Sequence, residues 1–309
     1  MIRGPRVSVV IPTKDRLNYL RTALASVEAQ TFRDLELLVL DDGSVDGTRE
    51  FLDGYRSAFP FRWLSFQGRE RSILRNTGVR EASGELIAFL DDDDEWLPEK
   101  LATQVACLDA KPAVGMLATR TTVMDGMGRV SEGGTKQHQR LYDLQDRKGR
   151  TYAALVSLCI MFTSSIIVRR HVFERVGGYD PAFSACEDLD LYLRVASVSV
   201  IECLAAPLTR YRVHPGGSAS RLNDAQIRVC IKHCERLDRD PALDPAGDVR
   251  RGLVMSSARC HYVGRRYAEA LRTLRSMPRG SWRFLLRSEN CGSVMRIILR
   301  YAKTFLRGG

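Results

Sequence analysis

The sequence predicts an α/β protein with a mostly parallel sheet flanked by helices, followed by an all-helical, basic C-terminal extension. Two patterns carry this prediction. In the first hundred residues, short apolar runs alternate with amphipathic helical patterns, which is typical of a parallel sheet covered by helices. From Asn223 onward the strand patterns end, and residues 225–309 have helical periodicity only. We therefore expect a first domain over residues 1–222 and a helical extension over residues 223–309.

The first domain is expected to begin with four strands, each followed by a helix. The strands are Val7–Ile11, Leu35–Leu40, Arg62–Phe66 and Glu85–Leu90. The helices begin at Leu17, Thr48, Ser72 and Glu95, the last of them covering Glu95–Cys107. Asp41, Asp42, Gly43 and Ser44 form a turn sequence after the second strand. Ligands of such sheets bind beyond the carboxyl ends of the strands, so the residues that follow each strand are the candidates for function.

Further strands are expected at Val114–Ala118 and Ile166–Val168, and the polar stretch from Gly126 to Arg150 is expected to be a mobile loop. Tyr152–Val168 is the longest weakly polar stretch, with 17 residues, four of which are Ser or Thr. A membrane span needs about 20 mostly apolar residues, so a buried helix followed by a buried strand is the better interpretation. The N-terminal apolar run is too short for a signal peptide, which favours a cytoplasmic protein.

The composition is that of an ordinary globular protein. The chain has 309 residues, 44% of them hydrophobic and 27% charged, which excludes a disordered chain and a collagen-like repeat. Its eight cysteines contain no CxxC pair, so we expect buried thiols in a reducing compartment rather than a disulfide framework. Cys230 and Cys234, with His233 between them, fit one helix face, and packing is favoured there over metal binding.

The net charge of +10 is concentrated at one end of the chain. Residues 249–309 hold 14 Lys and Arg against 2 Asp and Glu, whereas residues 1–248 hold 33 against 35. Within residues 293–307 the cations lie on one stripe of a predicted helix and the apolar side chains on another. Contact with an anionic membrane surface is the favoured interpretation, with peripheral attachment to the inner face of the cell membrane as its consequence. A helix docked on the first domain, or an oligomer or nucleic-acid contact, is the alternative.

Four consecutive acids, Asp91–Asp94, follow the fourth predicted strand. Like charges this close repel each other and raise each other's pKa unless a cation lies among them. Carboxylate oxygens suit Mg²⁺ or Mn²⁺, which complete their coordination with water and substrate phosphates. The alternative is an acidic cap for the following helix, for which one Asp would suffice.

Six motifs in order give the chain a family resemblance. They are VSVVIPTKDR, LVLDDGSVDGT, LRNTGVREASGELIAFLDDDDEWLPEKL, VGGYD, CEDLDLYLR and YRVHPGGS. Together they resemble family 2 of the glycosyltransferases, inverting nucleotide-sugar enzymes with a GT-A fold, over roughly residues 5–220. The resemblance implies that the nucleotide-sugar side lies within residues 1–118 and the acceptor side within residues 119–222.

The resemblance also implies roles on the donor side. Asp42 matches the residue that hydrogen-bonds the nucleobase, and Pro12 and Lys14 follow the first strand where relatives line the base or ribose. Arg75 matches a base or diphosphate contact, for which a surface arginine is the alternative. Asp92 fills the variable position of the DxD motif within the same donor-binding segment.

The metal site implied by the resemblance consists of Asp93, Asp91 and His214. Asp93 is the direct ligand of Mg²⁺ or Mn²⁺, Asp91 shares its motif and also contacts the ribose, and His214 matches a residue that joins the metal or the diphosphate in some relatives. A lone surface histidine is the alternative for His214.

On the acceptor side, Asp188 matches the catalytic base and Glu187 its acidic neighbour, although both also fit a helix N-terminus. The implied reaction is transfer of a sugar from a UDP-, dTDP- or GDP-linked donor to a hydroxyl of a glycan or a lipid-linked acceptor, in cell-surface polysaccharide or glycolipid synthesis. No nucleic-acid partner is expected. A nucleotidylyltransferase and a non-catalytic nucleotide-sugar binding relative are the alternatives.

Overall fold

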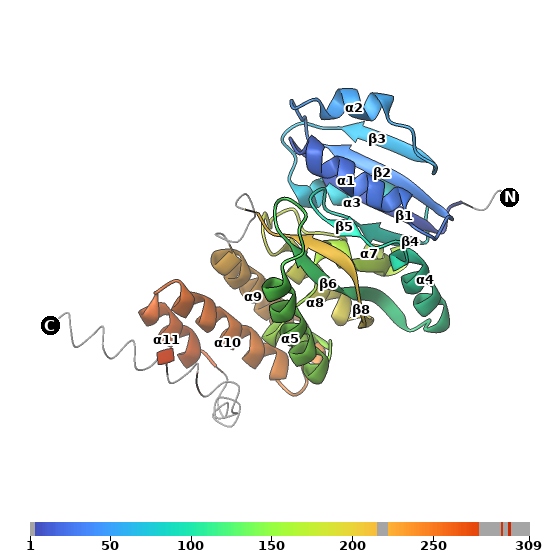
Figure 1. The fold of residues 1–309 in the computed structure, drawn as a ribbon. Helices are drawn as coiled ribbons and strands as arrows, with labels where there is room; N and C mark the ends of the chain where they lie inside the picture. Colours follow the sequence, from blue (N-terminus) through green and yellow to red (C-terminus); the bar gives the residue numbers. More distant parts are fainter. Residues whose placement is uncertain (1–3, 215–221, 278–291, 293–295, 298–309) are drawn as a thin grey trace. The chain divides into compact units, whose positions relative to one another are not determined.

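The computed structural model describes residues 4–214, 222–277, 292 and 296–297. In this part of the chain a single sheet contains eight strands in the order β3-β2-β1-β4-β7-β6-β8-β5 (Figure 1). The first four strands are parallel to each other: β1 (Val7–Thr13), β2 (Leu35–Asp41), β3 (Phe61–Ser65) and β4 (Leu86–Phe89). The predicted mostly parallel sheet is thus confirmed.

The second half of the sheet mixes strand directions. β7 (Ile166–Arg169) lies antiparallel between β4 and β6 (Val114–Met124), and β8 (Val200–Arg212) runs parallel to β6. The short β5 (Glu95–Trp96) pairs antiparallel with β8. Because β7 is reversed, its first residues lie at the same edge of the sheet as the last residues of β1, β2, β4, β6 and β8.

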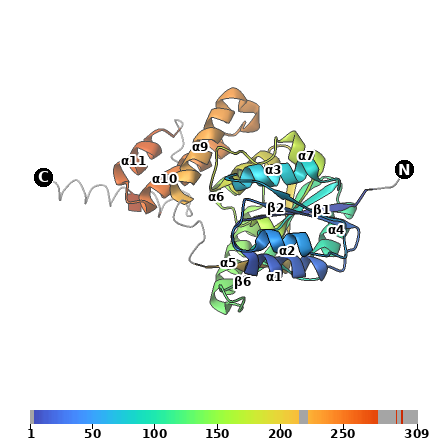
Figure 2. The ribbon, with the colours of Figure 1, turned by 90° about the horizontal axis from the view of Figure 1, so that it is seen from above.

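Helices cover both faces of the sheet. α1 (Leu17–Glu28), α2 (Thr48–Gly54) and α4 (Lys100–Ala110) share an apolar core with alternate residues of β1 and β2. α3 (Arg71–Glu81) packs on the opposite face, where a Cβ at Gly78 would come within 2.4 Å of Val10. Figure 2 shows α3 and α7 (Arg170–Arg175) on one side of the sheet and α1 and α2 on the other.

Three expectations about local structure were wrong. The predicted loop Gly126–Arg150 contains a helix, α5 (Glu132–Lys148), which Ser131 caps by accepting a hydrogen bond from the Gly134 N–H at 3.2 Å. The predicted helix Glu95–Cys107 begins only at Lys100, because β5 occupies its first residues. β8 was not predicted, since it is mostly half-buried and contains the exposed Pro207, which is unusual inside a strand.

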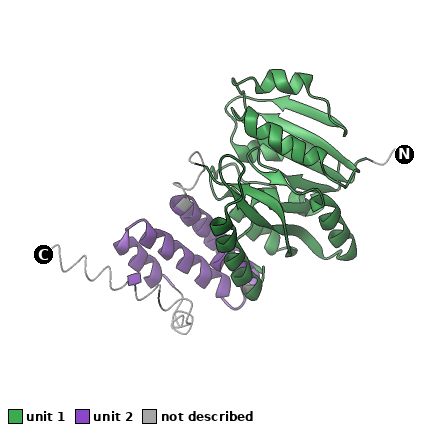
Figure 3. Cartoon of the chain, in the orientation of Figure 1, with its two compact units in different colours: residues 1–151, 160–217 green, residues 152–159, 218–309 purple. Residues whose placement is uncertain are grey.

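The chain divides into two compact units, residues 1–151 with 160–217, and residues 152–159 with 218–309 (Figure 3). This division differs from a single cut near residue 222, because residues 152–159 join the second unit. That unit contains α6 (Tyr152–Ser157), α9 (Leu222–Arg239), the short helix η3 (Pro241–Leu243), α10 (Asp248–Val263) and α11 (Tyr267–Arg275). The Tyr152 hydroxyl lies 2.6 Å from Nδ1 of the buried His233 and joins α6 to α9. The helix and strand expected within Tyr152–Val168 are present as α6 and β7.

Most of the predicted basic amphipathic helix, residues 293–307, lies outside the described residues. Of its members the structure describes Arg296 and Ile297. Ile297 is buried in a cluster with four residues of α10 and α11, Met255, Ala258, Ala270 and Leu274. At this position the apolar stripe packs on the helical unit itself. Within the described parts of the chain, none of the helices has the length and apolar character needed to cross a membrane.

Candidate functional site

The candidate site lies at the edge where the strands of the first unit end. Thr13 closes β1, Asp41 closes β2, and the acids Asp91–Asp94 follow β4. Ser164 precedes the reversed strand β7, and Arg212 closes β8. Side chains separated by up to about two hundred positions in the sequence therefore meet at one edge, as expected for an open α/β sheet.

The turn between β1 and α1 has a strained backbone that two hydrogen bonds hold in place. Asp15 has φ +50°, in the left-handed region that residues other than glycine seldom adopt. Its N–H donates to Ser44 Oγ at 2.8 Å, and its Oδ1 accepts from the Val45 N–H at 2.7 Å. The Leu17 N–H donates to Asp46 Oδ2 at 2.8 Å. The loop after β2 thereby fixes the backbone on both sides of Arg16, and with it the position of the Arg16 Cα.

The predicted nucleobase contact lies at the end of β2. Asp42 is buried and accepts hydrogen bonds from Lys14 Nζ at 2.8 Å and from the Arg69 N–H at 2.7 Å. The Asp42 carboxylate raises the pKa of Lys14. Asp41 accepts from the backbone N–H three residues later, which is the turn role weighed for it above. Pro12 is buried within β1. The structure thus brings Lys14 and Asp42 together, while Pro12 supports them from the sheet.

The four acids after β4 alternate between two environments. Asp92 and Asp94 are buried, at 5% and 1% exposed, whereas the side chains of Asp91 and Asp93 are 24% and 17% exposed. The two acids of the predicted DxD motif, Asp91 and Asp93, therefore lie on the partly exposed side of this segment, whereas Asp92 and Asp94 belong to the protein interior.

Asp91 belongs to a buried bridge that Arg75 forms. Arg75 of α3 is 1% exposed and donates from Nη2 to Asp91 Oδ1 at 2.5 Å and from Nη1 to Glu187 Oε1 at 2.9 Å. Burial opposes the charge on Asp91, but Arg75, with smaller contributions from Arg71 and Arg16, outweighs burial and holds the pKa of Asp91 below its usual range. Arg75 is thus a buried link between the two predicted acidic motifs, and the surface-arginine alternative was wrong.

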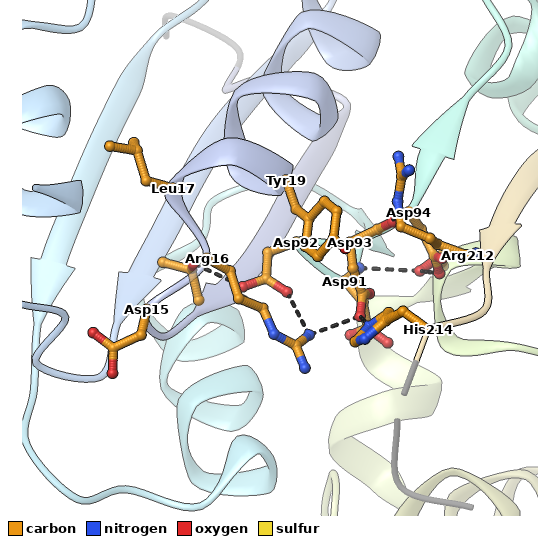
Figure 4. A network of polar contacts seen from close by, with 12 residues as sticks. Asp15, Arg16, Leu17, Tyr19, Asp91, Asp92, Asp93, Asp94, Arg212 and His214 are labelled. Carbon is orange, nitrogen blue, oxygen red and sulfur yellow. Dashed lines mark hydrogen bonds and ion pairs between the residues drawn. The ribbon is translucent and has the colours of Figure 1, made fainter. Parts of the chain in front are cut away.

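Asp93 lies between a cation and an imidazole (Figure 4). Its Oδ2 accepts from Arg16 Nη1 at 2.7 Å and lies 2.9 Å from His214 Nε2. The same Arg16 nitrogen lies 3.1 Å from Asp92 Oδ1. His214, which the family resemblance assigns to the metal site, therefore lies beside the acidic segment, and its ring also lies 5.5 Å from that of Tyr19.

The two inner acids accept hydrogen bonds from neutral groups of the interior, and Asp92 in addition pairs with Arg16. Asp92 accepts from Thr13 Oγ1 at 2.8 Å, and burial together with the charge of Asp93 raises its pKa to about 7. Asp94 accepts from Ser164 Oγ at 2.5 Å and from the Arg212 N–H at 2.8 Å, and burial raises its pKa well above the usual range. Protonation of these buried carboxyls lowers the charge of the cluster without a bound ion.

Asp188, the predicted base, lies at the N-terminus of α8 (Glu187–Ala196) next to the buried Glu187. Burial and the neighbouring charge of Glu187 raise the pKa of Asp188 to about 6, although the Leu189 N–H donates to its Oδ1 at 2.7 Å. A carboxylate with such a pKa is ionised at neutral pH and is a stronger base than an ordinary aspartate. The position is compatible with both the helix-cap and the base interpretations.

Tyr179 connects the acceptor motifs to α3. Asn76 Nδ2 donates to the Tyr179 carbonyl at 2.7 Å, and Asn76 Oδ1 accepts from the Tyr179 N–H at 2.8 Å. Gly178 precedes it with φ +68°, and a Cβ there would lie 2.6 Å from Asn76 Oδ1. The glycine therefore permits a close approach that places the Tyr179 ring 5.2 Å from the Arg75 guanidinium carbon.

The donor set is compatible with a hard divalent cation that keeps several non-protein ligands. Among the described residues no group of three or more His, Cys, Asp and Glu side chains is arranged so that it could hold a metal ion by itself. Asp93 Oδ2 lies 2.9 Å from His214 Nε2, and Asp91, like Asp93, is on the partly exposed side of the acidic segment. Mg²⁺ and Mn²⁺ bind through one or two protein groups plus water and phosphate, so these residues fit such an ion.

Sequence reasoning missed Arg16, Thr13, Ser164 and Arg212 as members of the site. Arg212 Nε donates to the Asp93 carbonyl at 2.7 Å and its Nη2 to Glu95 at 2.6 Å, so it stabilises the acidic segment from β8. A usable signal existed for Arg16 and Thr13, because both follow directly on the first strand. Ser164 and Arg212 had no such signal, since they reach the site through β7 and β8.

Comparison with known proteins gives a consistent assignment. The profile of Glycosyl transferase family 2 matches residues 8–177, more than half of the chain. An uncharacterized glycosyltransferase of Nostoc sp. is 30% identical over 218 residues, which cover 68% of this chain and 65% of that protein. A GalNAc(5)-diNAcBac-PP-undecaprenol beta-1,3-glucosyltransferase of Campylobacter jejuni is 38% identical over 104 residues, covering 32% of this chain and 33% of that protein. This chain thus spans less than two-thirds of the length of either relative.

Two solved structures share the fold. S. aureus TarS 1–349 in complex with UDP-GlcNAc aligns with a TM-score of 0.61 at 17% identity, covering 96% of this chain and 81% of that one. The mannosyltransferase PcManGT from Pyrobaculum calidifontis, in complex with GDP-Man and Mn²⁺, aligns with a TM-score of 0.61 at 19% identity, covering 98% and 87%.

Proposed function

The chain belongs to glycosyl transferase family 2, and on this premise we propose that it is a metal-dependent inverting glycosyltransferase. It would move a sugar from a nucleotide-diphosphate sugar to a hydroxyl group of a glycan or lipid-linked acceptor. The observation that carries this proposal is the Arg75 bridge, because it holds the donor motif at Asp91 and the acceptor motif at Glu187 on the same guanidinium. A donor and an acceptor bound at these motifs would be neighbours.

The donor's nucleotide would bind at the ends of β1 and β2. Asp42 presents a buried carboxylate to a nucleobase N–H, and Lys14, whose side chain is half exposed, places a cation beside it. Fold relatives were solved with UDP-GlcNAc and with GDP-Man, which supports a UDP-, dTDP- or GDP-linked donor without selecting one of them.

Asp93 and His214, with Asp91, would hold Mg²⁺ or Mn²⁺. Such an ion, when bound, neutralises the negative charge that develops on the departing nucleoside diphosphate. The presence of Mn²⁺ in the mannosyltransferase complex supports this cofactor.

The acceptor step is a single displacement. Asp188 removes the proton of the acceptor hydroxyl, the acceptor oxygen forms a bond to the anomeric carbon, and the bond from that carbon to the phosphate oxygen breaks. Since one displacement inverts the configuration, the mechanism requires one base and no enzyme nucleophile, unlike retaining hydrolases, which use two close carboxylates. Asp188, with its pKa raised to about 6, meets that requirement.

The name of the Campylobacter jejuni relative contains a glycan linked to undecaprenol diphosphate as the molecule that receives glucose, which supports a lipid-linked glycan as acceptor. Cell-surface polysaccharide or glycolipid synthesis is the corresponding pathway class.

The test separates donor binding from transfer. Nucleotide sugars are screened for Mn²⁺-dependent protection of the full chain against thermal unfolding, and hits are assayed for transfer. Asp93→Ala should lose the Mn²⁺-dependent protection, whereas Asp188→Asn should keep it and lose transfer. Asp53→Asn, an exposed acid on α2, serves as the control that changes neither.

Each other outcome has a defined meaning. Protection without transfer by the unmodified chain would support the non-catalytic relative. Pyrophosphate release from a nucleoside triphosphate and a sugar phosphate would support a nucleotidylyltransferase. Transfer retained by Asp188→Asn would remove Asp188 from its role as base.

A further inference from the structure

Arg16 pairs with the carboxylate that is the predicted direct metal ligand. Asp93 accepts through Oδ2 from Arg16 Nη1 at 2.7 Å (Figure 4). The same guanidinium nitrogen reaches Asp92 Oδ1 at 3.1 Å, so one cation serves two of the four acids. A guanidinium carries one positive charge and cannot be deprotonated in a protein, which makes it a permanent internal counter-ion.

Arg16 differs from Arg75, which also pairs with one of the four acids, in how tightly its side chain is held. The Arg75 side chain is 1% exposed and is held by two carboxylates from different elements. The Arg16 side chain is 31% exposed and its two partners are adjacent residues of one loop. Its backbone, in contrast, is fixed by the strained turn at Asp15 described above. The guanidinium can therefore leave Asp93 while its Cα stays at the end of β1.

From these observations we propose that Arg16 is the residue that couples metal binding to donor binding. Without donor, its guanidinium competes with a divalent ion for Asp93, so the free protein binds the ion weakly. A donor's diphosphate offers the guanidinium a second anionic partner, and arginine forms paired hydrogen bonds with phosphate oxygens. Release of Asp93 to the ion and capture of the diphosphate by Arg16 then favour each other, and by linkage each ligand raises the affinity for the other.

This inference rests on the proposed function but is tested without sugar transfer. Mn²⁺ alone is titrated into the full chain, and free Mn²⁺ is followed by its electron paramagnetic resonance signal. Arg16→Gln removes the competing charge and leaves a shorter, neutral polar side chain. We expect it to bind Mn²⁺ about tenfold more tightly than the unmodified chain, the change that corresponds to losing one charge-assisted competitor.

Two variants make the outcome specific. Arg21→Gln removes an exposed positive charge of α1 that lies over the Phe51 ring instead, and it should change Mn²⁺ affinity less than about twofold, because exposed charges act weakly over distance. Arg16→Lys keeps the charge on a shorter side chain without the planar guanidinium, and its affinity should lie between those of the unmodified chain and Arg16→Gln. Should Arg16→Gln fail to fold, as judged by its thermal transition, the comparison of Arg16→Lys with the unmodified chain carries the test.

The coupling itself is measured by repeating the Mn²⁺ titration with UDP, dTDP and GDP in turn. The diphosphate that strengthens Mn²⁺ binding to the unmodified chain should do so less in Arg16→Gln. Equal or weaker Mn²⁺ binding by Arg16→Gln, or an equal gain in Arg21→Gln, would overturn the proposal. Absence of sugar transfer combined with the expected Mn²⁺ pattern would count against the proposed function and leave this inference standing.

Discussion

Replacing Arg75 tests whether the buried bridge stabilises the site. Arg75→Met keeps most of the side-chain volume but removes two charge-assisted hydrogen bonds, of 2.5 Å to Asp91 and 2.9 Å to Glu187. It leaves these two carboxylates without their shared cation. Loss of one partner from a buried ion pair costs about 3–5 kcal/mol. For a unit of this size we expect a fall in Tm of about 10 °C.

The pH dependence gives this prediction a sign. In the unmodified chain Arg75 holds the pKa of Asp91 below its usual range, so its stabilisation is present above the unfolded-state pKa and is lost as the pH falls through the folded-state pKa. In Arg75→Met the largest cation that opposes the burial of Asp91 is gone, and only the weaker effects of Arg71 and Arg16 remain, so the pKa of Asp91 rises and the variant gains less stability than the unmodified chain as the pH rises. The difference in unfolding free energy between the two proteins should therefore be larger at pH 8 than at pH 5.

Urea unfolding at both pH values measures this difference. The double variant Arg75→Met with Glu187→Gln is the control, because removing one stranded carboxylate should recover about 1–2 kcal/mol of the loss. A pH-independent difference, or a double variant whose cost equals the sum of the single costs, would refute the reasoning.

Two further predictions concern single groups. The pKa of about 6 at Asp188 predicts that kcat/KM for transfer is constant above this pH and falls about tenfold per pH unit below it, since the ionised carboxylate is the base. A profile of kcat/KM against pH that does not fall below about pH 6 would contradict this. Lys100 is fully buried, with Nζ 2.8 Å from Gln104 Oε1 and 4.1 Å from the Trp96 ring centre, and burial depresses its pKa well below the usual value. The stability that Lys100 contributes is therefore lost as the pH falls toward its folded-state pKa. Between pH 7 and 10 the unmodified chain should gain stability relative to Lys100→Met, by up to about 1.4 kcal/mol per pH unit. Denaturant unfolding at several pH values measures this, and an unfolding free energy that changes with pH equally in both proteins would refute the prediction.

The parts of the fold that the sequence predicts best are those that depend on local pattern. The buried parallel strands are continuous apolar runs, as at Val7–Ile11 and Glu85–Leu90, and few other structures accommodate such runs in a short segment. The acids at Asp91–Asp94 and at Glu187 were equally visible, because carboxylates that follow a buried strand or open a helix stand out in the sequence.

The parts that escaped prediction depend on tertiary contacts. α5 is polar and begins with two glycines, yet Thr121 of β6 lies 3.1 Å from His138 on the helix, and such contacts outweigh its weak propensity. Arg16 looked like an ordinary turn residue, because its importance comes from acids some 75 positions later. The sequence likewise shows Arg75 as one cation of a helix and not as a buried bridge.

The reversed direction of β7 has a consequence for how such a site can change. Because β7 begins at the edge of the sheet where its neighbours end, Ser164, which precedes β7, lies at this edge and donates a hydrogen bond to Asp94. The segment between β6 and β7, from Met124 to Thr163, contains α5 and α6, and both of its ends lie at the same edge of the sheet. Substitutions at exposed positions of this segment, such as Lys136 on α5, can therefore accumulate without loosening the anchor that Ser164 provides for Asp94.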